Sequence, residues 1–128
     1  MKRFIVALAV GALLVAVTPA RAVVAVAIPS AELLESFVPP VAATAKGGPF
    51  FLLNTDLGIE HSIVSVAKRP ENKPWCDQFD VGQCPLFYAE AVVQGQSEVL
   101  GLENTASGRT YNYYCGVHQR MTGALHIL

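Results

Sequence analysis

Three residues with metal-binding side chains follow one another at intervals of three near the end of the chain: Cys115, His118 and Met121. They come directly after residues 110–115, in which large residues alternate in the manner of a β-strand with one buried face. The chain therefore has to place a thiol, an imidazole and a thioether on one short loop at the end of a strand. This requirement limits the folds that the rest of the sequence can adopt.

The rest of the sequence predicts an all-β fold. Short apolar or alternating runs are separated by Gly, Pro and Asn, and nothing after the N-terminus reads as a long amphipathic helix. Residues 46–49 (Lys-Gly-Gly-Pro) predict a hairpin turn, and residues 30–36 fit one short helix with Ser30 as its N-cap. A chain of 128 residues allows one domain, and we expect a β-sandwich. The expected strands are residues 23–28, 41–45, 50–54, 62–67, 87–93, 98–102, 110–115 and 123–128.

Residues 1–22 have the layout of a cleaved secretory signal peptide. A basic start precedes an apolar run over residues 4–17, and small residues surround a cleavage point after Ala22, with a second possible point after Ala27. A membrane anchor is the alternative, but this apolar run is shorter than the roughly 20 residues that span a bilayer. We therefore expect a domain at 23–128 that is exported to a periplasm or the cell exterior, without stable insertion in the membrane.

Charge excludes one class of partner. Cleavage removes three basic residues, which leaves six against ten acidic ones and a formal charge of −4. An acidic domain without a basic cluster is a poor binder of nucleic acid.

The cysteines divide into a pair and one left over. Cys76 and Cys84 lie eight residues apart in a turn-rich segment, so in an oxidising compartment they can form a disulfide that closes a small loop. The odd cysteine is Cys115, and binding of its thiolate to a metal would explain why it remains unpaired.

Soft sulfur donors and imidazole suit copper. Two histidines, one cysteine and a weakly bound axial methionine make up the blue-copper ligand set. Cys115, His118 and Met121 supply three of these four ligands, and the candidate for the second histidine is His61. Zinc could accept two histidines and a cysteine, but its usual ligand set has no thioether.

Each of these residues also has an ordinary structural interpretation. Met121 could fill the core, Cys115 could be a buried thiol, and His61 could be a surface histidine. The spacing of the three loop residues favours the metal site over these alternatives. His126 belongs to the outward face of the last strand, opposite Leu125, and is expected to face solvent.

The motif resembles a known family. Residues 111–123 are similar to the ligand loop and flanking strands of the plastocyanin, amicyanin and pseudoazurin group of cupredoxins, and the two-residue gap after His118 is most similar to amicyanin. Asn54 and Asp56, followed by His61, resemble the first-ligand region of that group. The resemblance extends over about residues 37–128.

The resemblance implies a Greek-key β-sandwich with one type 1 copper ion bound by His61, Cys115, His118 and Met121. It implies a protein that carries single electrons between redox protein partners, with His118 as the electron port, and we expect a monomer. No catalytic acid, base or open substrate site is evident in the sequence, so we do not expect an enzyme. Two alternatives are a copper carrier that delivers metal to a cuproenzyme and a copper-free cupredoxin domain used in adhesion or signalling. A single methionine and three histidines after residue 22 argue against delivery, and the complete ligand set argues against a copper-free domain.

The sequence departs from the family pattern in two places. Ser62 follows the first histidine where the family usually has an asparagine that ties the two ligand segments together. Gln119 and Arg120 replace the usual proline and aromatic residue, which makes the exposed rim more polar and adds a positive charge.

Overall fold

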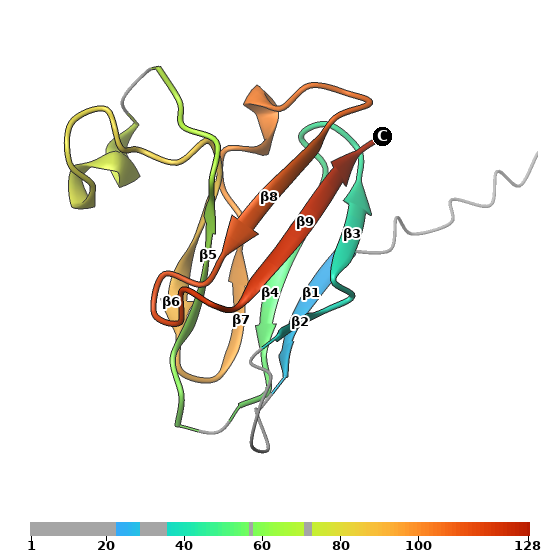
Figure 1. Cartoon of the computed structure of the whole chain (residues 1–128), viewed down its shortest axis with the longest axis vertical. Coiled ribbons are helices and arrows are strands. Elements are labelled where there is room, and N and C mark those ends of the chain that lie inside the picture. The colour runs from blue at the N-terminus through green and yellow to red at the C-terminus, as the bar shows by residue number, and fades with distance from the viewer. Residues whose placement is uncertain (1–22, 29–35, 57, 71–72) are drawn as a thin grey trace, which may run out of the picture.

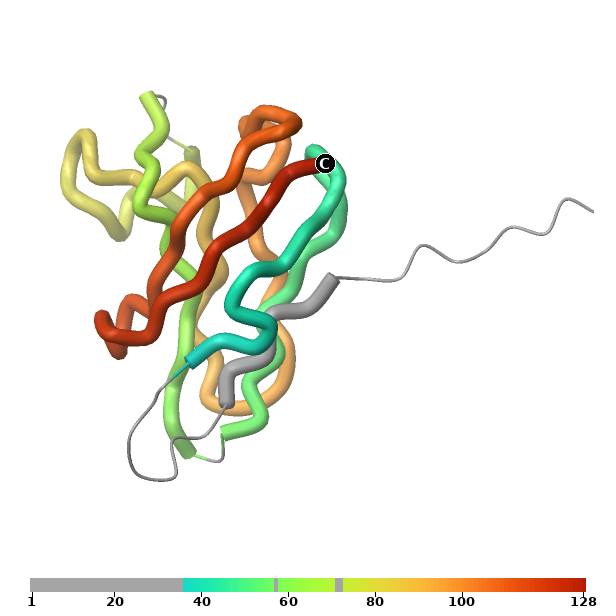
Figure 2. Tube along the Cα trace, turned by 45° about the vertical axis from the view of Figure 1, so that its right-hand side comes forward, coloured from blue at the N-terminus to red at the C-terminus, as the bar shows by residue number. Residues whose placement is uncertain are grey.

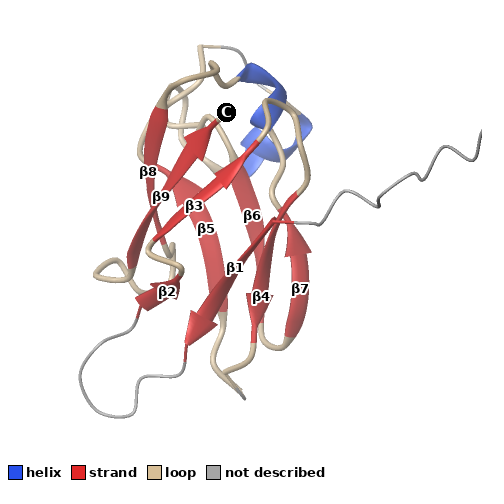
Figure 3. Cartoon of the chain, turned by 90° about the vertical axis from the view of Figure 1, so that its right-hand side faces the viewer, coloured by secondary structure: helices blue, strands red, loops and turns tan. Residues whose placement is uncertain are grey.

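The computed structural model describes residues 23–28, 36–56, 58–70 and 73–128. Within these residues, nine strands form two sheets that pack against each other (Figures 1 and 3). Two short 3-10 helices, η1 (Pro74–Gln78) and η2 (Leu102–Asn104), lie in the connections. The strands are β1 (Val23–Ile28), β2 (Ser36–Val38), β3 (Val41–Thr44), β4 (Phe50–Asn54), β5 (His61–Ser65), β6 (Tyr88–Val92), β7 (Gly95–Glu98), β8 (Thr110–Tyr114) and β9 (Thr122–Ile127).

The chain passes several times from one sheet to the other. One has four strands in the order β2-β1-β4-β7, and the other has five in the order β3-β9-β8-β5-β6. Neighbouring strands are antiparallel except for the pairs β1–β4 and β3–β9, which are parallel. Figure 2 shows the second of these pairs, with the cyan trace of β3 beside the dark red trace of β9. This is the all-β sandwich that the sequence predicts.

Tyr113 lies at the centre of the core between the sheets. Its ring makes edge contacts with Phe37, Phe50 and Phe87, with ring centroids 5.0, 6.2 and 6.4 Å away. Across the β8–β9 ladder its partner is Gly123, and any side chain at that position would collide with the tyrosine ring. The ring therefore locks together the two strands whose connection carries the loop of predicted ligands.

Most predicted strands are confirmed, but the predicted hairpin at residues 46–49 is wrong. The turn exists, with the N–H of Gly48 donating to the carbonyl of Ala45 at 2.8 Å. It leads, however, from β3 in one sheet to β4 in the other, so the two strands do not pair. A turn signal predicts that the chain reverses direction but does not select the strand that each arm will pair with.

Two further expectations have different outcomes. The strand expected over 98–102 is formed earlier, as β7, and its residues alternate between half-buried and exposed at the edge of the sheet. Its polar composition fits that edge position. Because β7 contains no apolar run, the apolar pattern of the sequence did not predict it. The short helix expected at 30–36 lies outside the described residues except for Ser36, which begins β2. Among the residues described, no helix is long and apolar enough to cross a membrane.

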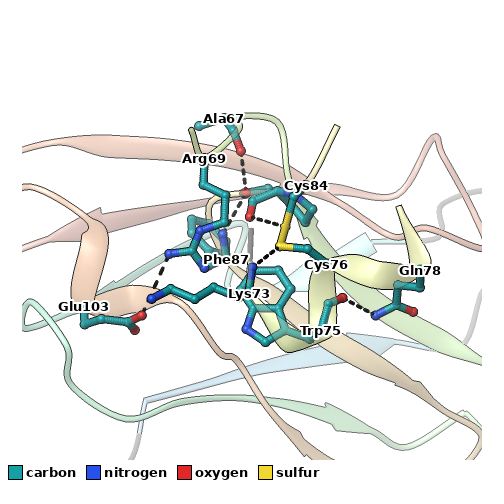
Figure 4. The surroundings of a disulfide bond; sticks show 11 residues. Ala67, Arg69, Lys73, Trp75, Cys76, Gln78, Cys84, Phe87 and Glu103 are labelled. Atoms are coloured by element: carbon teal, nitrogen blue, oxygen red, sulfur yellow. Dashed lines mark hydrogen bonds and ion pairs between the residues drawn. A yellow bond between two sulfur atoms is a disulfide. The ribbon is translucent and has the colours of Figure 1, made fainter. Parts of the chain in front are cut away.

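The predicted disulfide between Cys76 and Cys84 is confirmed, with 5.2 Å between the two Cα atoms. Both residues are buried, and the segment they close covers one end of the sandwich, at the upper left of Figure 1. Beside the bridge, the guanidinium of Arg69 lies 5.0 Å from the centre of the Trp75 ring (Figure 4). The disulfide therefore holds a packed aromatic and cationic cluster against the sheets.

The hydroxyl of Tyr113 leads to a stability prediction. It is buried without a hydrogen-bond partner among the described residues, and burial raises its pKa well above the ordinary value. We expect Tyr113→Phe to raise the free energy of unfolding by about 1 kcal/mol, because an unpaired buried hydroxyl is destabilising. Chemical denaturation measures the change. Tyr111→Phe is the control and should lower stability, since the Tyr111 hydroxyl accepts a hydrogen bond from the N–H of Ala106. A Tyr113→Phe protein less stable than the parent would contradict the prediction.

The disulfide leads to a second stability prediction. Replacing both Cys76 and Cys84 with alanine should lower the free energy of unfolding by about 2–3 kcal/mol, because the loop they close restricts the unfolded chain. Denaturation of the double variant beside the parent protein measures this change. Mass spectrometry that found both thiols free in the parent protein would contradict the presence of the disulfide.

Candidate metal centre

The connection between β8 and β9 carries three of the four predicted ligands. It runs from Cys115 to Met121 at the end of the sandwich opposite the disulfide, at the lower left of Figure 1. The N–H of Cys115 donates to the carbonyl of Met121 at 2.9 Å, and the N–H of Met121 donates to the carbonyl of His118 at 2.9 Å. These two bonds close the loop on itself, so its metal-binding side chains start from fixed backbone positions.

The fourth predicted ligand, His61, is the first residue of β5, the strand next to β8. The two strands are antiparallel with Val64 opposite Tyr114, so the residues before Val64 run beside the loop that follows Tyr114. His61 is buried, with 1% of its surface exposed. The sheet thus brings a histidine next to Cys115 from a position 54 residues earlier in the chain.

Three donor atoms converge at this point. The Sγ of Cys115 lies 3.8 Å from Nδ1 of His61 and 3.8 Å from Nδ1 of His118. The metal-binding atoms of the three residues all lie within 4.8 Å of one another. A nitrogen about 2.0 Å and a sulfur about 2.3 Å from a shared ion, at tetrahedral to trigonal angles, would be roughly 3.5–3.7 Å apart. The three side chains are therefore already arranged around a space of the size of one metal ion.

Ser62 ties the two donor-bearing segments together. Its N–H points at the Sγ of Cys115 from 3.4 Å, and its hydroxyl oxygen accepts a hydrogen bond from the N–H of Gly116 at 2.9 Å. The short serine side chain thus reaches the loop directly. The same N–H also directs the positive end of its dipole at the sulfur.

Asp56 holds the other side of His61. Its Oδ2 lies 3.1 Å from Nε2 of the ring, and both residues are buried. An ionised carboxylate can only accept a hydrogen bond, so this contact pairs with the tautomer of His61 that has its hydrogen on Nε2, which leaves the lone pair of Nδ1 on the side of Cys115. From the sequence, Asp56 stood out only as part of the segment that resembles the first-ligand region. It could not be given a role, because an acidic residue five positions before a histidine is a common pattern.

Met121 and His126 occupy different places. Met121 is fully buried in the core cluster, on the same closed loop as Cys115. His126 lies on β9, where its Nδ1 and the hydroxyl of Thr110 are 3.0 Å apart at an exposed position. The cluster of metal-binding groups found among the described residues does not include His126. Its expected position on the outward face of the last strand agrees with this hydrogen bond.

The rim of the loop is open to solvent. Val117, Gln119 and Arg120 are exposed, and His118 between them is half-buried. His118 is thus the donor residue nearest to solvent, whereas His61 and Cys115 lie inside.

The donor set decides which metals suit this cluster. A thiolate with two imidazoles suits copper and is acceptable to zinc, and a thioether supplied by Met121 of the same loop would favour copper. His61, Cys115 and His118 therefore form a candidate copper site.

Comparison with known proteins agrees with this fold. No protein-family model and no curated protein matches the sequence. Amicyanin from Paracoccus versutus superposes with a TM-score of 0.54 at 18% identity, over 88% of this chain and 87% of amicyanin. A purple cupredoxin from Nitrosopumilus maritimus gives a TM-score of 0.54 at 17% identity, over 82% of this chain and 98% of that protein. The copper-containing nitrite reductase from Thermus scotoductus gives 0.56 at 18% identity, over 96% of this chain and 25% of the reductase. The chain has the cupredoxin fold.

Proposed function

We propose that this protein is an exported type 1 copper protein that carries single electrons between redox partners. The observation that carries the proposal is the convergence of one Sγ and two Nδ1 atoms, each nitrogen 3.8 Å from the sulfur. One thiolate and two imidazoles, with a weak axial thioether, are the blue-copper ligands, which serve both Cu(I) and Cu(II).

In this proposal His61, Cys115 and His118 are the strong ligands and Met121 is the axial one. Bound copper would supply a one-electron couple, and the protein would hold its donors fixed for either oxidation state. The closed loop fixes the backbone of Cys115 and Met121, and the contacts of Ser62 fix the loop against β5. Little has to move when an electron arrives, which favours rapid transfer.

The depth of each donor suggests the route of the electron. Cys115 and His61 are buried, which suits a site that passes electrons to other proteins more than one that binds a substrate. His118 is half-buried beside the exposed Val117 and Arg120, so its imidazole edge is the proposed electron port. We therefore propose a carrier and not an enzyme, with redox proteins as donor and acceptor.

Export is part of the proposal. The predicted signal peptide at residues 1–22 would direct the chain out of the cytoplasm, and the bond between Cys76 and Cys84 fits an oxidising compartment. We place the protein in a periplasm or at the cell exterior.

The second candidate function is delivery of copper to another protein. Burial of His61 and Cys115 favours electron transfer, because a delivery site has to release its metal readily. Adding Cu(II) to the exported protein separates the two functions. An intense thiolate-to-copper band with a reversible one-electron voltammogram supports electron transfer. Colourless binding, with rapid loss of copper to a chelator, supports delivery.

We expect Cys115→Ser to abolish the visible band while the protein remains folded, because a hydroxyl cannot replace the charge transfer from a thiolate. Absorbance and circular dichroism of the copper-treated variant test both parts. His126→Ala is the control, since His126 lies outside the donor cluster, and it should remain blue. A Cys115→Ser protein that kept the intense band would rule out this ligand assignment.

Arg120 provides a test of partner docking. It is exposed beside the proposed port on a domain with net negative charge, so we expect it to attract an acidic patch on a partner. Arg120→Glu should slow bimolecular electron transfer several-fold at low ionic strength, and added salt should reduce the difference. Stopped-flow kinetics with the native partner measures these rates.

The matched control is Arg109→Glu, which makes the same charge change at an exposed position just before β8, at the other end of that strand. It should slow transfer less than Arg120→Glu. Equal rates for Arg120→Glu and the parent protein at low salt would show that Arg120 takes no part in docking.

A further inference from the structure

A buried carboxylate contacts the ring nitrogen of His61 that faces away from the donor cluster. The Oδ2 of Asp56 lies 3.1 Å from Nε2, and 9% of the aspartate side chain and 1% of the histidine side chain are exposed. Water therefore screens this pair less than it screens a surface pair, and the negative charge acts more strongly on the ring than it would across solvent. The contact is independent of any metal, because it is made by the protein alone.

The backbone holds Asp56 in place. Its N–H donates to Oδ1 of Asn54 at 2.8 Å. The Nδ2 group of Asn54 in turn contacts the carbonyls of Ile59 at 2.7 Å and Val92 at 2.6 Å. Asn54 thus joins the end of β4, the segment before His61 and the end of β6. The position of the carboxylate is therefore fixed by the sandwich.

We propose that Asp56 is a positioning residue that sets the reduction potential of the metal bound at His61, an inference that rests on the copper function proposed above. A carboxylate that accepts a hydrogen bond from the Nε2–H group holds the ring with its Nδ1 lone pair available and makes the imidazole a stronger metal ligand. The added negative charge favours Cu(II), the more highly charged state, over Cu(I). Reduction transfers one electron from a redox protein and forms or breaks no covalent bond. Asp56 therefore acts only on the relative stability of the Cu(II) and Cu(I) states. The result is a lower potential than the same site would have without the carboxylate.

Asp56→Asn tests this inference. The new amide oxygen can still accept a hydrogen bond from the Nε2–H group, but the negative charge of the carboxylate is removed. We expect the affinity for Cu(II) to fall about tenfold relative to that for Cu(I), at the lower end of the usual effect of such partners. For a one-electron couple, a tenfold change corresponds to a rise of about 59 mV in the reduction potential. Voltammetry of the copper-loaded protein measures it, while the intense visible band should remain.

Glu60→Gln is the matched control, because it removes the same charge from an exposed residue next to His61. Its effect on the potential should be much smaller and should disappear in high salt, whereas the shift in Asp56→Asn should persist. Equal shifts for the two variants, or an unchanged potential in Asp56→Asn with the blue band intact, would overturn the role of Asp56 and leave the copper function standing. Absence of the blue band from the parent protein would overturn both.

A second measurement does not require Asp56→Asn to fold. Nitrogen NMR of the copper-free parent protein reports which nitrogen of the His61 ring carries the proton. We expect the proton on Nε2, facing Asp56, and an unprotonated Nδ1. A proton on Nδ1 would overturn the inference.

Discussion

The two contacts of Ser62 with the loop between β8 and β9 connect the parts of the chain on which the candidate site depends. One runs from the Ser62 N–H to the sulfur of Cys115, and the other from the N–H of Gly116 to the serine hydroxyl. They add to the short ladder between β5 and β8, in which Val64 lies opposite Tyr114 and Ser65 opposite Tyr113. The contacts also place an N–H dipole on the thiolate. A single residue thus fixes both the geometry and the electrostatics of the donor that gives copper sites their colour.

The loop is as rigid as the two strands that end in it. Tyr113 lies over Gly123 across the β8–β9 ladder, and its ring contacts Phe37 and Phe50 of the opposite sheet and Phe87 just before β6. Movement of either strand would disturb this packing, and packed interiors resist such changes. The core therefore transmits its rigidity to Cys115, which follows Tyr113 by two residues on the same face. The packing that stabilises the sandwich therefore also holds the metal-binding loop in place.

The sequence predicted what is local and missed what depends on register. Cys115, His118 and Met121 could be identified because their spacing is a property of a single loop. His61 was the candidate for the missing second histidine, but no local spacing ties it to the loop, since its approach to Cys115 depends on how β5 pairs with β8. The contact between Asp56 and His61 depends on the course of the intervening turn, and no periodicity indicates it. The mistaken hairpin at residues 46–49 has the same origin, because strand partners are selected by the whole sandwich.

Buried ionisable side chains lie at both ends of the molecule, and their different partners suggest different roles. Arg69, at the disulfide end, is 5% exposed and stacks on Trp75, while its Nε and Nη1 atoms lack partners among the described residues. A buried charge with so few partners is destabilising, and a nearby disulfide can offset that cost by restricting the unfolded chain. At the other end, Asp56 and His61 satisfy each other, and the remaining ring nitrogen faces the sulfur of Cys115. Because that nitrogen is directed at another donor atom, the arrangement at this end is explained by a metal ion and not by stability alone.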